Sequence, residues 1–168
     1  MIERHHTEAG VTSRALYSPC ERYRFGLERR WGTGGTLLWI MLNPSTADER
    51  RNDPTIERCQ RRARRMGFGA MRIANLFAFR ATRPADLRRA DAPIGAENDA
   101  LVHQWHEEAA MTVAGWGVHG AFMGRGPRLA GDLAAPVHML GLTRGGHPRH
   151  PLYVAYDVDP TLWHRRAP

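Results

Sequence analysis

Lysine is absent from this chain of 168 residues, and all 24 of its basic side chains are arginines. Without lysine, no side-chain amine exists to form a Schiff base, and no P-loop lysine exists to hold a nucleotide phosphate. Cysteine is scarce as well: Cys20 and Cys59 lie far apart in the chain, and two thiols cannot supply the four ligands of an iron–sulfur cluster or a structural zinc site. We therefore expect neither a cofactor nor a metal.

Long apolar runs are also absent. No stretch reaches 18 apolar residues, and the first ten residues are charged, so the sequence predicts neither a membrane span nor a signal peptide. A cytoplasmic protein is the resulting expectation. The hydrophobic content of 42% over 168 residues suits a single domain with its core at about residues 20–160.

Positive charge is what the chain has in excess, with a formal net charge of +7. Clustered arginines attract phosphates and release condensed counterions when they bind nucleic acid. The composition favours DNA as the partner, although some basic proteins have no anionic partner. No obligate protein partner is inferred.

Apolar runs alternate with helical patterns along the chain. Strands are expected at about residues 23–28, 36–42, 70–76, 111–114 and 137–142. Helices are expected at about residues 54–66, 82–90 and 96–109, with a weaker helical segment between the last two strands. Asp53 followed by Pro54 is typical of a helix start. The alternation predicts an α/β protein, a three-layer α/β/α sandwich around a central, mostly parallel sheet.

Polar and aromatic residues follow several of these apolar runs. They lie at residues 43–46, 75–77, 116–117 and 147–152. Each segment also has an ordinary structural explanation, as a turn, a strand end, core or surface loop. In open α/β sheets, however, ligands bind beyond the carboxyl ends of the strands. We therefore expect these segments to surround one crevice.

The side chains of this crevice suit a base that has been flipped out of DNA. The Asn75 amide offers a donor and an acceptor to the edge of the base, and Phe77 or Trp116 could stack on its face. The base-binding candidates are Pro44, Ser45, Asn75, Phe77, Trp116 and His147.

Phosphate contacts are expected chiefly from the predicted helix at residues 54–66, which carries five arginines. An exposed, solvated face is the alternative explanation of these arginines. The DNA-binding candidates are Arg58, Arg61, Arg62, Arg65, Arg80, Arg149 and Leu152.

The same segments resemble a known bacterial family. Residues 41–48, 52–56, 75–82, 116–117 and 148–153 closely resemble the uncharacterised DUF1643 domain, over about residues 20–160. That family carries no assigned activity, so this resemblance implies relatedness and not function.

A more distant resemblance, to uracil-DNA glycosylases, implies an activity. In that superfamily one strand ends in an Asp/Asn-Pro loop, a later strand ends in a base-reading Asn, and another ends in Trp-Gly. A final loop carries His-Pro before a leucine that wedges into the duplex. This chain has the elements in the same order, beginning at Asn43, Asn75, Trp116 and His150.

Two departures accompany this similarity. Met41 stands where the superfamily has a glycine, and His147 begins a second His-Pro pair that competes with His150. The resemblance implies a uracil-DNA-glycosylase-like fold and a monofunctional DNA glycosylase.

The implied mechanism assigns catalytic roles to Asn43, His150, Asp48 and Asp53. His150 would donate a hydrogen bond to the departing base, and Asn43 would orient the attacking water. An amide is a poor general base, so Asp48 or Asp53 would assist the water. The base stays open: uracil, a damaged base, or a modified base of viral DNA, with a role in repair or in antiviral defence.

Other functions remain compatible with these residues. A non-catalytic nucleic-acid or nucleotide-binding module would use the same arginines and the same pocket. A hydrolase or transferase of free nucleosides would need the pocket but not the basic surface, and salt-dependent DNA affinity would distinguish it from the other two.

Overall fold

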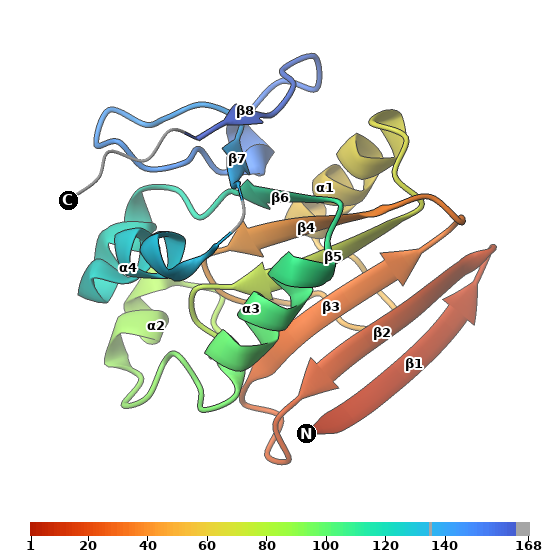
Figure 1. The fold of residues 1–168 in the computed structure, drawn as a ribbon. Helices are drawn as coiled ribbons and strands as arrows, with labels where there is room; N and C mark the ends of the chain where they lie inside the picture. Colours follow the sequence, from red (N-terminus) through yellow and green to blue (C-terminus); the bar gives the residue numbers. More distant parts are fainter. Residues whose placement is uncertain (135, 164–168) are drawn as a thin grey trace.

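The computed structural model describes residues 1–134 and 136–163, and its strands form one eight-stranded sheet (Figure 1). The strands are β1 (Ile2–Glu8), β2 (Val11–Tyr17), β3 (Arg24–Arg30), β4 (Thr36–Met41), β5 (Ala70–Asn75), β6 (Met111–Ala114), β7 (His138–Met139) and β8 (Thr161–Leu162). The α-helices are α1 (Pro54–Arg65), α2 (Pro84–Arg89), α3 (Asn98–Glu108) and α4 (Arg125–Asp132). Two 3₁₀ segments, η1 (Val118–Gly124) and η2 (Pro151–Tyr153), complete the described chain.

The sheet is mixed, with the order β1-β2-β3-β5-β4-β6-β7-β8. Strands β5, β4, β6 and β7 run parallel to one another. The pairs β1–β2, β2–β3, β3–β5 and β7–β8 are antiparallel and outnumber the parallel pairs. The expected α/β class is confirmed, whereas the expectation of a mostly parallel sheet is wrong.

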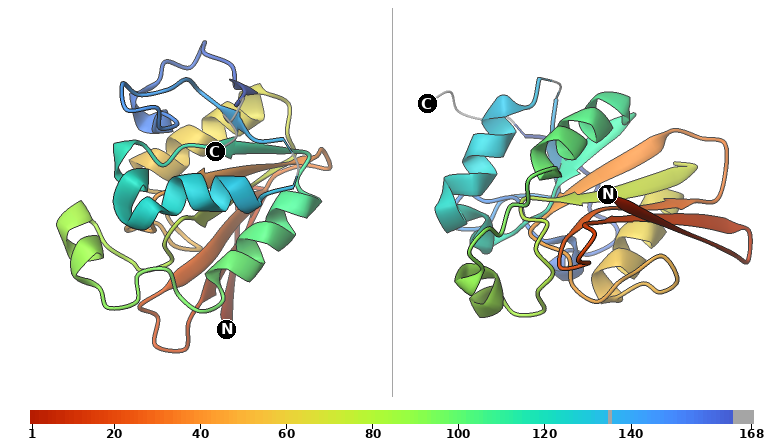
Figure 2. Two further views of the ribbon diagram at one scale, coloured as in Figure 1. Left: turned by 60° about the vertical axis from the view of Figure 1, so that its left-hand side comes forward. Right: turned by 90° about the horizontal axis from the view of Figure 1, so that it is seen from below.

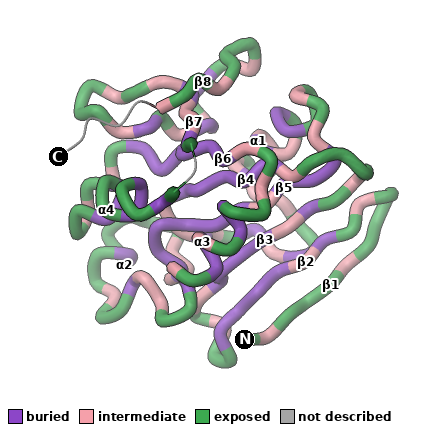
Figure 3. Tube along the Cα trace, viewed as in Figure 1, coloured by how far each residue is buried: buried purple, intermediate pink, exposed green. Residues whose placement is uncertain are grey.

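The amino-terminal hairpin explains this error. Strand β1 is exposed along most of its length, and the pair β1–β2 extends the sheet beyond its covered centre (Figure 3). A strand with an exposed surface carries no continuous apolar run, because such runs mark strands that are buried on both faces. The sequence pattern therefore revealed the parallel centre and missed the hairpin.

Helices cover both faces of the sheet, with α1 on one face and α3 and α4 on the other (Figures 1 and 2). Successive side chains of β4 point to opposite faces. Leu37 and Trp39 pack in the core beside α1, while Leu38 and Ile40 pack in the core beneath α3 and α4. All four are fully buried, which explains the unbroken apolar run of β4.

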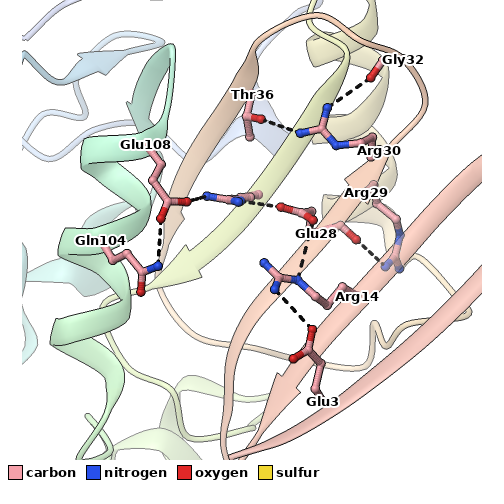
Figure 4. Close-up of polar contacts among 10 residues, drawn as sticks. Glu3, Arg14, Glu28, Arg29, Arg30, Gly32, Thr36, Gln104 and Glu108 are labelled. Carbon is pink, nitrogen blue, oxygen red and sulfur yellow. Dashed lines mark hydrogen bonds and ion pairs between the residues drawn. The ribbon is translucent and has the colours of Figure 1, made fainter.

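A network of paired charges, here called the Arg72 network, joins α3 to the antiparallel strands (Figure 4). Arg72 on β5 donates through Nε to Glu28 at 2.5 Å and through Nη1 to Glu108 on α3. Its guanidinium also lies 4.9 Å from the ring centre of Trp105. Arg14 and Glu3 extend the network across β2 and β1. The network stabilises the packing of α3 against the sheet.

Helix α1 begins as the sequence predicted. The Asp53 side chain accepts a hydrogen bond from the backbone N–H of Ile56 at 2.9 Å, and Pro54 occupies the first helical position. Among the residues that the structure describes, no helix has the length and apolar character needed to cross a bilayer.

Candidate functional site

A cavity of about 510 Å³ lies at the carboxyl ends of the parallel strands. Strand β4 has β5 on one side and β6 on the other, so the chain's progress across the sheet reverses around β4. Such a topological switch point is where open α/β sheets bind ligands. The predicted site residues that line the cavity are Asn43, Ser45, Asp53, Asn75, Trp116, Arg149, His150 and Leu152.

The other predicted site residues lie outside this lining. They are Pro44, Asp48, Phe77, His147, Arg58, Arg61, Arg62, Arg65 and Arg80. Phe77 is fully buried and packs against Phe122 with 5.3 Å between ring centres, so it cannot stack on a base in the cavity. Arg80 lines a neighbouring hollow and donates to the backbone carbonyl of Glu21 at 3.2 Å.

Asn43 lies in the loop that follows β4, and backbone contacts fix its amide. Its Nδ2 donates to the carbonyl oxygens of Pro44, at 3.0 Å, and Ala81, at 2.8 Å. Within the described part of the chain, its Oδ1 accepts no hydrogen bond. The amide therefore offers an oriented acceptor to a water or ligand in the cavity.

Of the two acidic candidates, Asp53 lines the cavity and Asp48 does not. Asp48 instead accepts from the backbone N–H groups of Arg50 at 2.8 Å and Arg51 at 2.7 Å. Burial acts to raise the pKa of Asp48, but these hydrogen bonds outweigh it and the pKa is lowered. Asp48 thus stabilises a turn, whereas Asp53 caps the start of α1 and also lines the cavity.

His150 lines the cavity, and contacts between two loops place it there. Gly117 N–H, after β6, donates to the carbonyl oxygen of Pro148 at 2.9 Å and so holds the final loop against the end of β6. His147 lies back from the cavity, in a turn where its backbone N–H donates to the Thr143 hydroxyl at 3.1 Å. Of the two competing histidines, the structure therefore brings His150 to the other site residues.

The protonation state of His150 follows from its surroundings. Burial lowers its pKa below the usual 6.5, and the nearby Asp53 carboxylate opposes this only in part. Its Nδ1 accepts a hydrogen bond from the backbone N–H of Leu152 at 3.2 Å. A neutral imidazole that accepts at Nδ1 carries its proton on Nε2. His150 is therefore a neutral residue with an Nε2–H donor.

Asn75 and Trp116 provide buried groups at the ends of β5 and β6. Asn75 is 1% exposed, and its Nδ2 has no hydrogen-bond partner in the described part of the chain. Trp116 is equally buried and packs tightly against η1, because a Cβ at Gly120 would lie 2.0 Å from its Cδ1. Asn75 thus retains an unpartnered donor, and so does Trp116, whose Nε1 has no hydrogen-bond partner in the described part of the chain although its ring packs as part of the wall.

Three arginines of α1 donate hydrogen bonds to backbone carbonyls of the segment that follows His150. Arg62 is 1% exposed, and its guanidinium donates to the carbonyl oxygens of Val154, Ala155, Tyr156 and Val158. Arg58 donates to the carbonyl oxygen of Pro151 at 2.9 Å, and Arg65 donates to that of Tyr156. These three arginines therefore hold the segment that carries His150, and their expected contact with DNA stays a prediction.

Arg61 is exposed, as Arg64 and Arg65 also are, and within the described part of the chain its hydrogen-bonded partner is Glu57 on the same helix, at 2.7 Å. The amphipathic pattern of α1 could not reveal which of its arginines contact the segment that carries His150. Nothing in the local sequence shows that carbonyl groups some 90 residues away pack on the helix, as the separation of 91 residues between Arg65 and Tyr156 illustrates.

The sequence interpretation did not identify several of the residues that line the cavity. Arg24, at the start of β3, lines the cavity although it is 1% exposed to solvent. Val118 and Tyr153 lie at the cavity with exposed fractions of 54% and 74%, so they present apolar surface at its rim. Tyr153 directly follows the predicted wedge residue Leu152, but no sequence signal separates Arg24 from the other arginines.

Among the residues that the structure describes, no group of three or more His, Cys, Asp or Glu side chains is placed to hold a metal ion. Cys59 is a buried residue of α1, and burial raises the pKa of its thiol. The polar side chains that line the cavity are amides, the imidazoles of His119 and His150, the Asp53 carboxylate, guanidinium groups and hydroxyl groups.

Comparison with known proteins places the chain in a family. No curated protein and no solved structure matches it. A family model described as a protein of unknown function (DUF1643) matches residues 24–152. This range begins at Arg24 and ends at Leu152, so it omits the β1–β2 hairpin and spans every predicted site residue of the cavity. Because the match covers more than half of the chain, the protein belongs to the DUF1643 family.

Proposed function

We propose that this protein is a monofunctional DNA glycosylase that hydrolyses the N-glycosidic bond of a flipped base. The observation that carries the proposal is that Asn43, Asp53, Asn75 and His150, from three separate parts of the chain, line one cavity of about 510 Å³. Small-molecule pockets commonly have such a volume, with a few convergent polar groups on a largely apolar wall.

On the base side of the reaction, the leaving group acquires negative charge as the glycosidic bond breaks. The Nε2–H of neutral His150 would donate to an oxygen of that base, as donors do in an oxyanion hole. Asn75 would read the edge of the base through the Nδ2 that lacks a protein partner. A buried donor that is left unsatisfied favours a ligand which supplies an acceptor.

On the sugar side, a water molecule must attack the electron-poor anomeric carbon. The Oδ1 of Asn43 would orient this water, because its Nδ2 is held by two carbonyl groups. Asp53 would accept the proton of the water, since one of its oxygens caps α1 and the other is left for this task. With no lysine in the chain, water is the expected nucleophile and an abasic strand the expected product.

The test is base release from a panel of oligonucleotides that contain uracil, damaged bases and the modified bases of viral DNA. Alkali then cleaves the strand wherever a base was lost. We expect alkali-dependent cleavage with at least one substrate and no covalent trapping by borohydride. Binding without release from any panel member would support the rival reading, a nucleic-acid-binding module, and efficient trapping would overturn the mechanism.

One observation favours a second candidate, a hydrolase of free nucleosides or nucleotides. Three of the four α1 arginines expected to contact DNA phosphates donate to the segment from Pro151 to Val158, which leaves fewer free guanidinium groups for a DNA backbone. The same panel should therefore include the free nucleosides. Release from nucleosides at rates equal to those from oligonucleotides would assign this second function.

A further inference from the structure

Arg24 is a buried cation at the cavity with little protein compensation. Its side chain is 1% exposed, and it donates through Nη1 to the carbonyl oxygen of Ala47. Its Nε is buried without a hydrogen-bond partner in the described part of the chain. Within the same residues, Arg24 forms no ion pair with a carboxylate; Asp53, which also lines the cavity, acts on it from a greater distance.

The other buried arginines donate to the protein through two or three of their nitrogens. Arg29, on the same strand as Arg24, uses all three nitrogens, which donate to Asn52 and to nearby backbone carbonyls. Arg62 donates through its two terminal nitrogens to four carbonyl oxygens, although its Nε has no partner in the described part of the chain. Arg125 pairs with Asp99 and donates to the carbonyl oxygen of Leu76 at 2.9 Å. In the described part of the chain, Arg24 is therefore distinguished because only one of its three nitrogens donates to the protein and because it lines the cavity.

The hydrogen bond from Arg24 to the loop after β4 does not explain why the whole guanidinium group is buried at the cavity. The contact with Ala47 occupies one of the three nitrogens and leaves the Nε edge, which in arginine is suited to two parallel hydrogen bonds with a planar acceptor pair. Burial lowers the pKa of Arg24 to about 10, while Tyr17 and Asp53 act in the opposite direction, so the group stays charged at neutral pH. A buried charge is costly unless a partner compensates it.

We propose that Arg24 sets the substrate class of the cavity: a planar ring that is an anion, or becomes one as its glycosidic bond breaks. This inference rests on the proposed function. When the bond breaks, both electrons stay with the ring nitrogen, the water oxygen bonds to the anomeric carbon, and a water proton passes to Asp53. The ring then holds a negative charge, which the Arg24 fork and the Nε2–H of His150 stabilise together.

The same charge excludes another class of bases. An alkylated purine that already carries positive charge would meet a fixed cation at close range, and its departure as a neutral ring would gain nothing from Arg24. We therefore expect oxo-pyrimidines and other rings with an acidic N–H as substrates, and cationic alkylated purines to be rejected.

Binding of 5-nitrouracil to the intact protein tests this inference without catalysis. This ring ionises readily, and its absorbance changes when it does, so the spectrum reports the form that is bound. The control ligand is 1,3-dimethyl-5-nitrouracil, which has the same ring but no proton to lose. We expect the protein to bind the anion of 5-nitrouracil, to lower its apparent pKa, and to bind the dimethyl ring at least tenfold more weakly.

The variant for this test is Arg24→Met, which keeps a similar side-chain volume and removes the charge. It should bind the 5-nitrouracil anion about tenfold to a hundredfold more weakly than the wild type. Arg72→Met is the matched control, because Arg72 lies outside the cavity lining and should leave this affinity unchanged. Equal affinity of the wild type for both rings, or unchanged binding of the anion by folded Arg24→Met, would overturn the proposal.

The two ligands decide the matter on wild-type protein alone if Arg24→Met does not fold. The outcome is also separable from the proposed function. Selective anion binding without base release from any oligonucleotide or nucleoside would leave the Arg24 site standing and remove the glycosylase. Base release by a protein that binds both rings equally would do the reverse.

Discussion

Two arginines on adjacent strands have opposite surroundings. Arg72, on β5, lies between the carboxylates of Glu28 and Glu108. Arg24, at the start of β3, lines the cavity with its Nε unpartnered in the described part of the chain. A paired guanidinium joins elements of the fold, whereas a buried one without its counter-charge favours a ligand. The difference teaches that arginine content alone does not locate a binding surface, and that compensation of each charge does.

The largest effect should come from the polar residues of the cavity. His150→Ala and Asn43→Ala should each slow single-turnover base release by about a hundredfold or more, because each removes a group that acts mainly in the transition state. DNA affinity should change little. Arg72→Met is the control and should release base at nearly the wild-type rate. Full activity in both cavity variants would contradict the catalytic roles proposed for His150 and Asn43.

The next effect concerns stability, and here the order of the two arginines should reverse. Arg72→Met leaves Glu28 and Glu108 without their shared cation and should lower the free energy of unfolding by about 2 kcal/mol. Arg24→Met removes a buried charge that lacks an ion pair, so it should cost less than about 1 kcal/mol. Urea denaturation of both variants measures the difference. A larger loss in Arg24→Met would mean that Arg24 is chiefly structural.

A smaller effect is expected from pH through His150. Burial lowers the pKa of His150 below 6.5, so between its folded pKa and 6.5 the unfolded chain binds a proton that the folded chain does not. Stability contributed by His150 is therefore lost as the pH falls through that window. Base release should also decline, by roughly tenfold per pH unit below the folded pKa, because protonated Nδ1 cannot accept from Leu152.

The measurement is the pH profile of base release and of unfolding for the wild type and for His150→Gln. The glutamine variant should lose the acidic limb that His150 causes. His147→Gln is the matched control and should keep it, since His147 lies outside the cavity lining. Loss of the acidic limb in the His147→Gln variant would show that His147, and not His150, causes it.

The smallest effect should be seen at Arg61, an exposed arginine of α1. Arg61→Ala should change the slope of log affinity for DNA against log salt by no more than about one unit, the contribution of a single phosphate contact. Arg58→Ala instead removes a contact to the His150 loop, so it should lower base release more than it changes this slope. If this salt dependence of DNA affinity became much weaker in Arg61→Ala, α1 would be a DNA-binding helix.

Much of the parallel centre could be predicted from the sequence. The expected strands at residues 36–42, 70–76 and 111–114 match β4, β5 and β6 closely, and the Asp53-Pro54 start of α1 is confirmed. Buried parallel strands are recognisable because both faces need apolar side chains. The last expected strand, at residues 137–142, shortens to β7, since pairing with β6 involves only His138 and Met139.

The placement of single side chains was harder to predict. Phe77 follows Asn75 by two residues, yet Asn75 lines the cavity and Phe77 packs in the core beside Phe122. Asp48 and Asp53 lie in one loop. In the folded chain the Asp48 side chain accepts hydrogen bonds from backbone N–H groups, whereas Asp53 lines the cavity. Local sequence holds no information on which direction such a loop residue faces.

The sequence by itself determined the α/β centre, the family, and the segments that meet at the carboxyl ends of the parallel strands, because hydrophobic periodicity and turn residues act over short distances. The tertiary structure alone decided which arginines are compensated. Partners of Arg62 and Arg65 lie more than 90 residues along the chain, and Arg24 reaches the cavity from a strand whose pairing with β5 is antiparallel. Charge compensation depends on such distant neighbours, and they come together only when the chain has folded.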